Sequence, residues 1–182
     1  MTWGGGKPLN CVFFSLISRE KGVDVLLEAI KSCSQAVFSF YGNIEEGYKV
    51  DFERIVNSLS NAEYRGIFTG SDEAKYQLLS EYDVMLLPTR WAAEGIPGII
   101  VESRIAGIVP IVTNHNFNSE LVNDEYDGML INNLYSHEEL IKKIHQIDDD
   151  RKLYDRLRRN SIKRAEQYYI ENYIGDIISD LI

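Results

Sequence analysis

The sequence lacks the features that mark membrane-spanning and secreted proteins. Its apolar runs are far shorter than the roughly 20 residues that a helix needs to cross a bilayer. The opening residues, MTWGGGKPLN, contain no apolar stretch of the kind found in a secretory signal peptide. No N-x-[ST] acceptor for N-glycosylation occurs. We therefore expect a chain that neither spans a membrane nor is secreted.

Cysteine, histidine and positive charge are also scarce. The two cysteines, Cys11 and Cys33, fit buried reduced thiols in a cytoplasmic protein better than a disulfide scaffold. Three histidines, His115, His137 and His145, lie too far apart to indicate a metal site, so no metal is expected. The 19 Lys and Arg are outnumbered by 28 Asp and Glu, which gives a net charge of −9. A nucleic-acid partner is therefore not expected.

The 182 residues suit one domain, and short apolar runs alternate with segments of helical spacing. Strands are predicted at 11–17, 36–42, 64–70, 83–88, 109–114 and 128–131. Helices are predicted at 23–33, 50–60, 72–82, 136–147 and beyond 149. The order predicts an α/β fold with a Rossmann-like, doubly wound, mostly parallel sheet of about six strands and helices on both faces. Residues 1–10 are expected to be a flexible lead-in, 11–148 the core, and 149–182 C-terminal helices.

Residues 94–114, EGIPGIIVESRIAGIVPIVTN, are rich in β-branched residues but are predicted to begin with a helix. Pro97 suits the first turn of a helix, and Gly107 suits its C-terminal end. The VPIVTN that follows is itself a strand, and the two residues before it offer no good hairpin turn. The helix therefore begins directly after the loop that carries Glu94.

In a doubly wound sheet, ligands bind beyond the carboxyl ends of the strands. This edge collects the predicted loops 15–22, 42–43, 70–71, 88–98 and 113–119. The first N–H groups of the helix after Pro97 lack partners, and Gly95 and Gly98 allow close backbone approach, so a phosphate is the natural guest. Glu94 would repel a phosphate and is better suited to neutral hydroxyls beside it.

Two charged residues keep alternatives open on spacing alone. Glu102 lies inside the predicted helix, where it can accept hydrogen bonds from a ribose-like diol or form a structural salt bridge with Lys21 or an arginine. Lys21 can aim its ammonium group at an anion, or it can be a solvated lysine before a left-handed turn at Gly22. Trp91, in the loop 88–98, is a further candidate for a ligand contact.

The segment 94–114 resembles the E-x7-E signature of the retaining, nucleotide-sugar-dependent glycosyltransferases of family 4 (glycosyl transferases group 1), which have the GT-B fold. Other pieces are similar to the same family: REKGVDVLLEAI, GIFTG followed by YQLLSEYDVMLLPT, SELV followed by DGMLI, and EELIKKIHQI with NSIKRAEQYY. The resemblance extends over residues 11–172. Members have two Rossmann-like domains, and this chain is similar to the C-terminal one, which binds the sugar-nucleotide donor.

The resemblance implies roles for particular residues. Glu94 corresponds to the glutamate beside the donor sugar and its hydroxyls, and Glu102 to the one that holds the nucleotide ribose. Lys21 corresponds to the basic residue on the donor diphosphate, where it would offset charge that builds up on the leaving group. Glu94 and Lys21 are therefore the expected catalytic residues.

Further donor contacts follow from the same resemblance. Gly98, Ile99 and Ile100 would offer backbone N–H groups to the phosphates. Gly70 and Ser71 lie where the base-contacting loop of the family runs. The donor would be a UDP- or GDP-sugar, and no metal or other cofactor is required.

The chain departs from the family pattern at one position. Members commonly have Gly-Arg where this chain has Ser15 and Leu16, so a second cation for the diphosphate is missing. Arg19 or Arg90 is the expected replacement. The change leaves donor affinity and activity open.

The resemblance implies transfer of a hexose-like sugar to an acceptor in envelope polysaccharide synthesis. The N-terminal acceptor-binding domain or subunit is missing from this chain, so the chain is expected to be inactive alone. The alternative is a non-catalytic or split-subunit nucleotide-binding domain. A dinucleotide oxidoreductase is disfavoured because no G-x-G-x-x-G follows the first strand.

A local excess of basic residues occurs between residues 151 and 164 in this otherwise acidic chain. It could lie on an anionic membrane surface, face the missing domain or form a solvated helix face. Peripheral association of the full enzyme with the inner face of the membrane is therefore included among the expectations.

Overall fold

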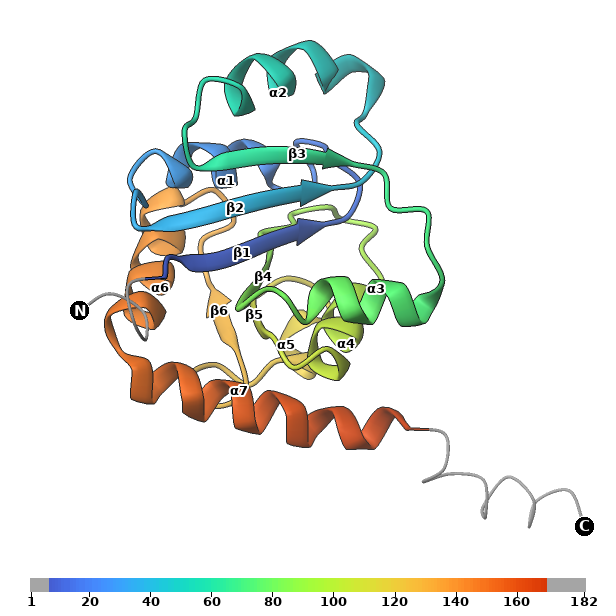
Figure 1. Cartoon of the computed structure of the whole chain (residues 1–182), viewed down its shortest axis with the longest axis vertical. Helices are drawn as coiled ribbons and strands as arrows, with labels where there is room; N and C mark the ends of the chain where they lie inside the picture. Colours follow the sequence, from blue (N-terminus) through green and yellow to red (C-terminus); the bar gives the residue numbers. More distant parts are fainter. Residues whose placement is uncertain (1–6, 170–182) are drawn as a thin grey trace, which may run out of the picture.

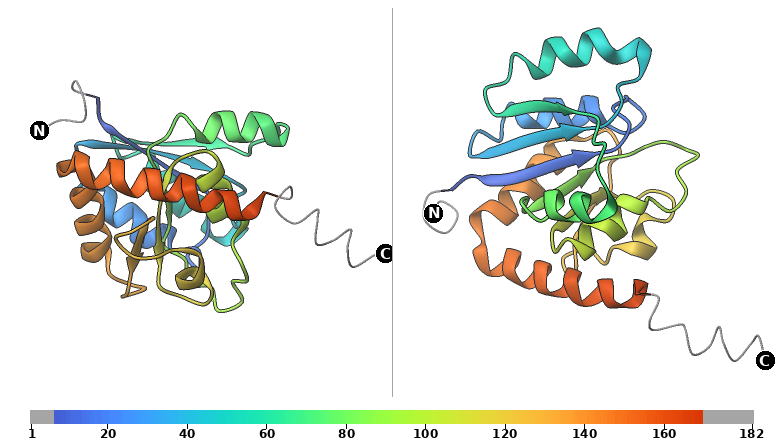
Figure 2. Two further views of the ribbon diagram at one scale, coloured as in Figure 1. Left: turned by 90° about the horizontal axis from the view of Figure 1, so that it is seen from below. Right: turned by 45° about the vertical axis from the view of Figure 1, so that its right-hand side comes forward.

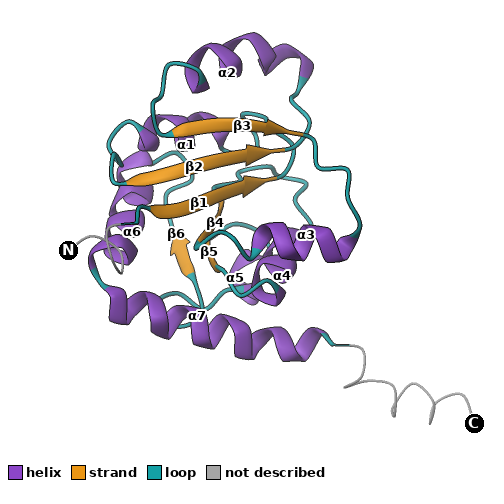
Figure 3. Ribbon diagram, in the orientation of Figure 1, coloured by secondary structure: helices purple, strands orange, loops and turns teal. Residues whose placement is uncertain are grey.

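The computed structural model describes residues 7–169, and at its centre lies a six-stranded sheet (Figure 1; Figure 3). Every strand pair is parallel, and the strand order is β3-β2-β1-β4-β5-β6. The strands are β1 Leu9–Phe14, β2 Ala36–Tyr41, β3 Ala62–Gly66, β4 Val84–Leu87, β5 Val109–Thr113 and β6 Met129–Ile131. The predicted Rossmann-like, doubly wound sheet is confirmed.

Helices cover both faces of the sheet. The helices are α1 Val23–Ile30, α2 Lys49–Val56, α3 Asp72–Leu79, α4 Gly98–Ile105, α5 Asn118–Leu121, α6 His137–Asp149 and α7 Arg151–Ala165, with short 3-10 turns η2 Glu46–Tyr48 and η3 Glu166–Tyr168. Figure 2 shows α1 and α3 on opposite sides of the sheet. On one side α1 packs against α6, and on the other α4 packs against α3 and α7.

The central strands are apolar along their whole length because both of their faces are covered. All four residues of β4 and all five of β5 are buried. A strand with only one covered face would instead alternate apolar and polar residues. The continuous apolar runs that predicted these two strands therefore reflect their position in the middle of the sheet.

Several predicted boundaries are wrong. The strand predicted at 11–17 begins at Leu9, where it pairs with Ala36, so the last two residues of the expected lead-in 1–10 belong to β1. Residues 1–6 of that lead-in lie outside the described part of the chain. It ends at Phe14, and Ile17 forms only an isolated bridge with Ile44. The strand predicted at 64–70 is Ala62–Gly66, and the first predicted helix stops at Ile30.

The helix predicted after Pro97 is present as α4. Pro97 is the residue before its first turn, with extended backbone angles, and Gly107 follows its end with a φ of 75°. This left-handed conformation is costly for residues with a Cβ, so glycine suits the end of the helix.

The C-terminal helices of the expected region 149–182 are described only as far as Tyr169. Asp149 belongs to α6, and residues 170–182 lie outside the described part of the chain. Some of the basic residues of α7 make internal contacts: Arg151 pairs with Asp155, and Arg158 donates to the Gly107 carbonyl. No helix within the described range is long and apolar enough to cross a membrane.

Candidate functional site

The strand order reverses between β1 and β4, and the loops that follow these two strands are in direct contact. Gly22, with a φ of 74°, comes so close to the other loop that a Cβ would lie 1.9 Å from the Pro88 carbonyl oxygen. The Arg90 N–H donates to the Glu20 carbonyl at 2.8 Å. Such a reversal is where doubly wound sheets bind ligands. The predicted loops 15–22 and 88–98 therefore meet at the expected place.

Lys21 and Glu94 form a buried ion pair across these two loops. Lys21 Nζ lies 2.7 Å from Glu94 Oε1 and 2.6 Å from Oε2, and the two side chains are 10% and 7% exposed. Thr89 Oγ1 also donates to Glu94 Oε2 at 2.7 Å. Lys21 Nζ lies 4.5 Å from the centre of the Trp91 ring, within the range of a cation–π contact. The solvated-lysine alternative for Lys21 is therefore wrong.

The loop after β5 supports the Glu94 loop through contacts that the sequence did not indicate. Asn116, with a φ of 48°, donates from Nδ2 to the carbonyl oxygens of Trp91, Ala92 and Glu94. Thr113 Oγ1 donates to the Thr89 carbonyl. An asparagine in the segment TNHNFN is a recognisable turn signal, but its partners more than 20 positions away are not readable from the sequence.

The start of α4, which directly follows the loop that carries Glu94, retains free donors. The Ile100 N–H already donates to the Pro97 carbonyl at 3.0 Å, so it is not available as expected. The N–H groups of Gly98 and Ile99 have no acceptor among the described residues. Together with the helix dipole, these two groups can hold one anionic oxygen or a phosphate.

Glu102 is paired, but with neither Lys21 nor an arginine. Lys75 Nζ, from α3, lies 2.8 Å from Glu102 Oε1, and the side chains are 17% and 26% exposed. The hydrogen bond to Glu102 raises the pKa of the Lys75 ammonium. The salt-bridge alternative is therefore present, although the pair is not fully buried and Glu102 remains accessible. Sequence reasoning missed Lys75 completely.

The two arginines expected to replace the missing cation are both engaged with carboxylates. Arg90 makes two hydrogen bonds to Asp24, at 2.9 and 2.8 Å, and its guanidinium lies 5.1 Å from the Tyr135 ring centre. Arg19 pairs with Asp51 at 3.0 Å, and both side chains are about half exposed. Neither arginine shares the Lys21–Glu94 contact.

The remaining expected site residues lie in the loops at the same edge. Leu16, where the family commonly has arginine, is 43% exposed. Ser71 is the N-cap residue before α3, and its Oγ accepts the Ala74 N–H at 3.3 Å. A Cβ on Gly70 would lie 2.3 Å from the Phe68 ring, so a side chain there would require the ring to move.

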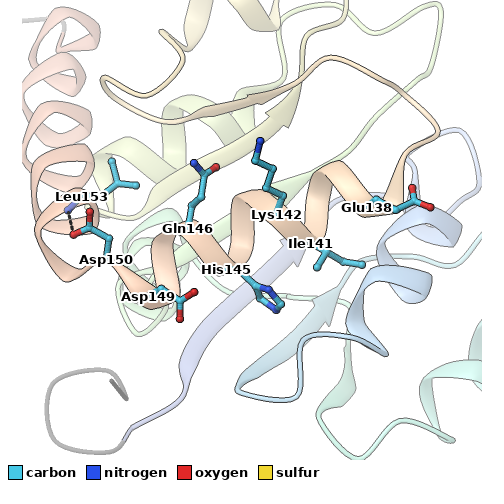
Figure 4. A pocket seen from close by; sticks show the side chains of 8 residues that line it. All are labelled: Glu138, Ile141, Lys142, His145, Gln146, Asp149, Asp150 and Leu153. Carbon is cyan, nitrogen blue, oxygen red and sulfur yellow. Dashed lines mark hydrogen bonds between the residues drawn. The ribbon is translucent and has the colours of Figure 1, made fainter.

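A separate surface groove of about 590 Å³ lies along α6 and the start of α7 (Figure 4). Its lining residues are Glu138, Ile141, Lys142, His145, Gln146, Asp149, Asp150 and Leu153. None of them is an expected site residue. Within residues 7–169, no three His, Cys, Asp or Glu side chains gather in a way that could hold a metal ion.

Comparison with known proteins agrees with the fold and with the signature. The family model described as glycosyl transferases group 1 matches residues 6–164. A 41.2 kDa protein in the cps region of Klebsiella pneumoniae is 30% identical over 126 residues, which are 69% of this chain and 33% of that protein. The UDP-Gal:alpha-D-GlcNAc-diphosphoundecaprenol alpha-1,3-galactosyltransferase of Escherichia coli is 38% identical over 76 residues, 42% of this chain and 19% of that enzyme.

Two solved structures share the fold at low sequence identity. The C-terminal domain of the group 1 glycosyl transferase LpcC from Francisella tularensis has a TM-score of 0.76 and 18% identity, covering 87% of this chain and 85% of that one. Anabaena HepE in complex with UDP and glucose has a TM-score of 0.80 and 20% identity, covering 98% of this chain and 49% of that one.

The chain spans about a third or less of the length of these curated relatives, and about half of HepE. The family model nevertheless covers most of the described residues and includes both signature glutamates. The chain belongs to the glycosyl transferases group 1 family, with the fold of a GT-B C-terminal domain.

Proposed function

We propose that the chain binds a nucleoside diphosphate sugar and supplies the donor half of a retaining glycosyltransferase. The observation that carries this proposal is the Lys21–Glu94 pair where the strand order reverses, on the loop that leads directly into the free N–H groups of α4. A cation and a helix N-terminus suit a diphosphate, and carboxylates suit sugar hydroxyls. UDP is bound by HepE, which has the same fold, and this supports a UDP-sugar as the first donor to test, with GDP-sugars next.

In this proposal each group has one task. The N–H groups of Gly98 and Ile99 bind a phosphate of the donor. Lys21 offsets the charge that develops on the diphosphate as its bond to the sugar breaks. Glu94 accepts hydrogen bonds from the sugar hydroxyls, which displace Thr89 or one N–H of Lys21 from its oxygens. Glu102 accepts the ribose hydroxyls.

The acceptor is proposed to be a precursor of an envelope polysaccharide, and a second domain or subunit is proposed to bind it. The relative from the cps region and the diphosphoundecaprenol galactosyltransferase support this class of product. The alternative is a nucleotide-binding subunit without catalysis of its own, and it rests on Leu16 in place of the usual arginine. Peripheral membrane association of the complete enzyme remains a prediction.

The test is a titration of the chain with UDP, GDP, UDP-glucose, UDP-galactose and GDP-mannose, followed by amide NMR and thermal unfolding. We expect at least one of them to raise the melting temperature and to shift amide signals around Lys21, Gly98 and Glu102. No response to any of the five at millimolar concentration would contradict the proposal. Binding without transfer, after the acceptor-binding half is supplied, would favour the non-catalytic alternative.

A further inference from the structure

Lys75 is a cation at the candidate site that neither the family signature nor the spacing of the sequence assigns. It lies in α3, and its Nζ reaches Glu102 Oε1 of α4 at 2.8 Å and Asp72 Oδ1 at 3.3 Å. The Lys75 side chain is only 17% exposed. The contact therefore fixes a lysine from one helix against the second signature glutamate of another.

The pair leaves part of Glu102 free. Lys75 contacts only Oε1, and no donor in residues 7–169 reaches Oε2. Both oxygens of Glu94, in contrast, already accept hydrogen bonds from Lys21, and one accepts from Thr89 as well. A carboxylate oxygen can accept two hydrogen bonds. Glu102 is thus the signature glutamate with more acceptor capacity to spare, because on Glu94 only Oε1 can accept a further hydrogen bond.

The pair also lies beside the start of α4. A Cβ on Gly98 would lie 4.0 Å from Glu102 Oε1, the oxygen that Lys75 holds. An unpaired carboxylate at this position would repel a phosphate bound to the free N–H groups of Gly98 and Ile99. The Lys75 ammonium offsets that charge while leaving Oε2 without a hydrogen-bond donor among residues 7–169, on a side chain that is 26% exposed.

We propose that Lys75 is a positioning residue for donor binding, holding Glu102 by Oε1 so that Oε2 accepts a hydroxyl of the nucleotide ribose. It also shields the bound phosphates from the Glu102 charge. The proposal rests on the proposed nucleotide-binding function and adds a residue to it. Lys75 acts through Glu102 and contacts no reacting atom.

The test compares ribonucleotides with analogues that lack the diol. Dissociation constants of UDP, GDP and their 2′,3′-dideoxy forms are measured by calorimetry for the wild-type chain and for Lys75→Met. We expect the wild type to prefer the ribonucleotide about tenfold, as for loss of a hydrogen bond to a charged group. Lys75→Met should bind the ribonucleotide about tenfold more weakly and discriminate against the dideoxy form less than twofold. Lys75→Arg, which keeps the charge, should restore most of the preference.

A matched control is Lys31→Met, which removes the same charge from another lysine–glutamate pair, with Glu28 in α1. It should leave the preference unchanged. Circular dichroism checks the fold of each variant, and Lys75→Gln replaces Lys75→Met if the latter unfolds; its preference should also fall below that of the wild type.

Three outcomes separate the explanations. An unchanged preference in the Lys75 variants would overturn the positioning role while leaving nucleotide binding intact. Tighter ribonucleotide binding by Lys75→Met would show that Lys75 competes with the ligand for Glu102, which also overturns the role. If the wild-type chain binds neither the bare nucleotides UDP and GDP nor any of UDP-glucose, UDP-galactose and GDP-mannose, the proposed function is refuted, and the role of Lys75 with it.

Discussion

Replacing Lys21 by methionine should leave a carboxylate nearly alone in a buried position. Glu94 is 7% exposed and would keep a single donor, the Thr89 hydroxyl at 2.7 Å. Breaking a buried ion pair by removing one partner costs about 3–5 kcal/mol. Because the hydroxyl donor remains and methionine preserves the packing against Trp91, we take the lower end, about 3 kcal/mol. For a domain of this size each kcal/mol lowers the melting temperature by about 2–4 °C, which predicts a loss of about 6–12 °C.

The pairing itself is measured by adding Glu94→Gln. The double variant has no buried charge left without a partner, so it should be less destabilised than the sum of the single variants by about 2 kcal/mol. Urea unfolding at pH 7, followed by circular dichroism, gives the free energies of unfolding of the wild type, the two single variants and the double variant. Additivity within about 0.5 kcal/mol would refute the view that these two side chains form a buried unit. The half-exposed Lys31 provides the control, and Lys31→Met should change stability by less than about 0.5 kcal/mol.

Three further predictions concern groups away from this pair. Asp127 is fully buried between two arginines, so Asp127→Ala should lower the free energy of unfolding by about 3–5 kcal/mol in urea titrations; a loss below about 1 kcal/mol would contradict the pairing. Burial raises the pKa of the Asp83 carboxyl, so its contribution to stability is greatest at low pH and is lost as the pH rises through the folded-state pKa. Asp83→Asn should therefore be more stable than the wild type at pH 7, and this difference in the free energy of unfolding, measured by urea titration, should shrink as the pH falls toward 3. A difference that grows as the pH falls would contradict a raised pKa for Asp83. Burial also raises the pKa of the Cys11 and Cys33 thiols, so both should react with a thiol reagent only after unfolding, whereas rapid labelling of the native chain would show that they are accessible.

The sequence was a reliable guide to the order of elements and a weaker one to their ends. Central strands such as β4 appear as uninterrupted apolar runs because the sheet is covered on both faces. The same rule extended the first strand to Ile17, although the strand ends at Phe14. Ile17 lies in the loop after β1, where its side chain is fully buried. It forms a single bridge with Ile44 and is not part of the sheet. Apolarity reports burial, and burial alone does not distinguish a strand from a packed loop.

In the candidate site, too, some features could be predicted from the sequence and others could not. The positions of the two signature glutamates and of Lys21 could be predicted, because each lies at a fixed place relative to a strand or helix end. Their partners could not. Lys21 and Glu94 are 73 positions apart, and Lys75 and Glu102 are 27 apart, so each pair depends on which loops and helices pack together. Periodicity along one segment carries no information about that packing.

The two lysine pairs change how the site must work if it binds a donor. Lys21 is the cation expected to meet the diphosphate, yet its charge is already balanced by Glu94. A diphosphate that simply approached this pair would gain little from it, and the two proposed arginine substitutes are paired as well. Productive binding therefore requires an exchange in which sugar hydroxyls take over acceptor sites on Glu94 while an N–H of Lys21 turns to the phosphate. A nucleotide without its sugar has no sugar hydroxyl that could replace Lys21 as a hydrogen-bond donor to Glu94. The sugar, and not only the nucleotide, should consequently contribute to affinity at this site.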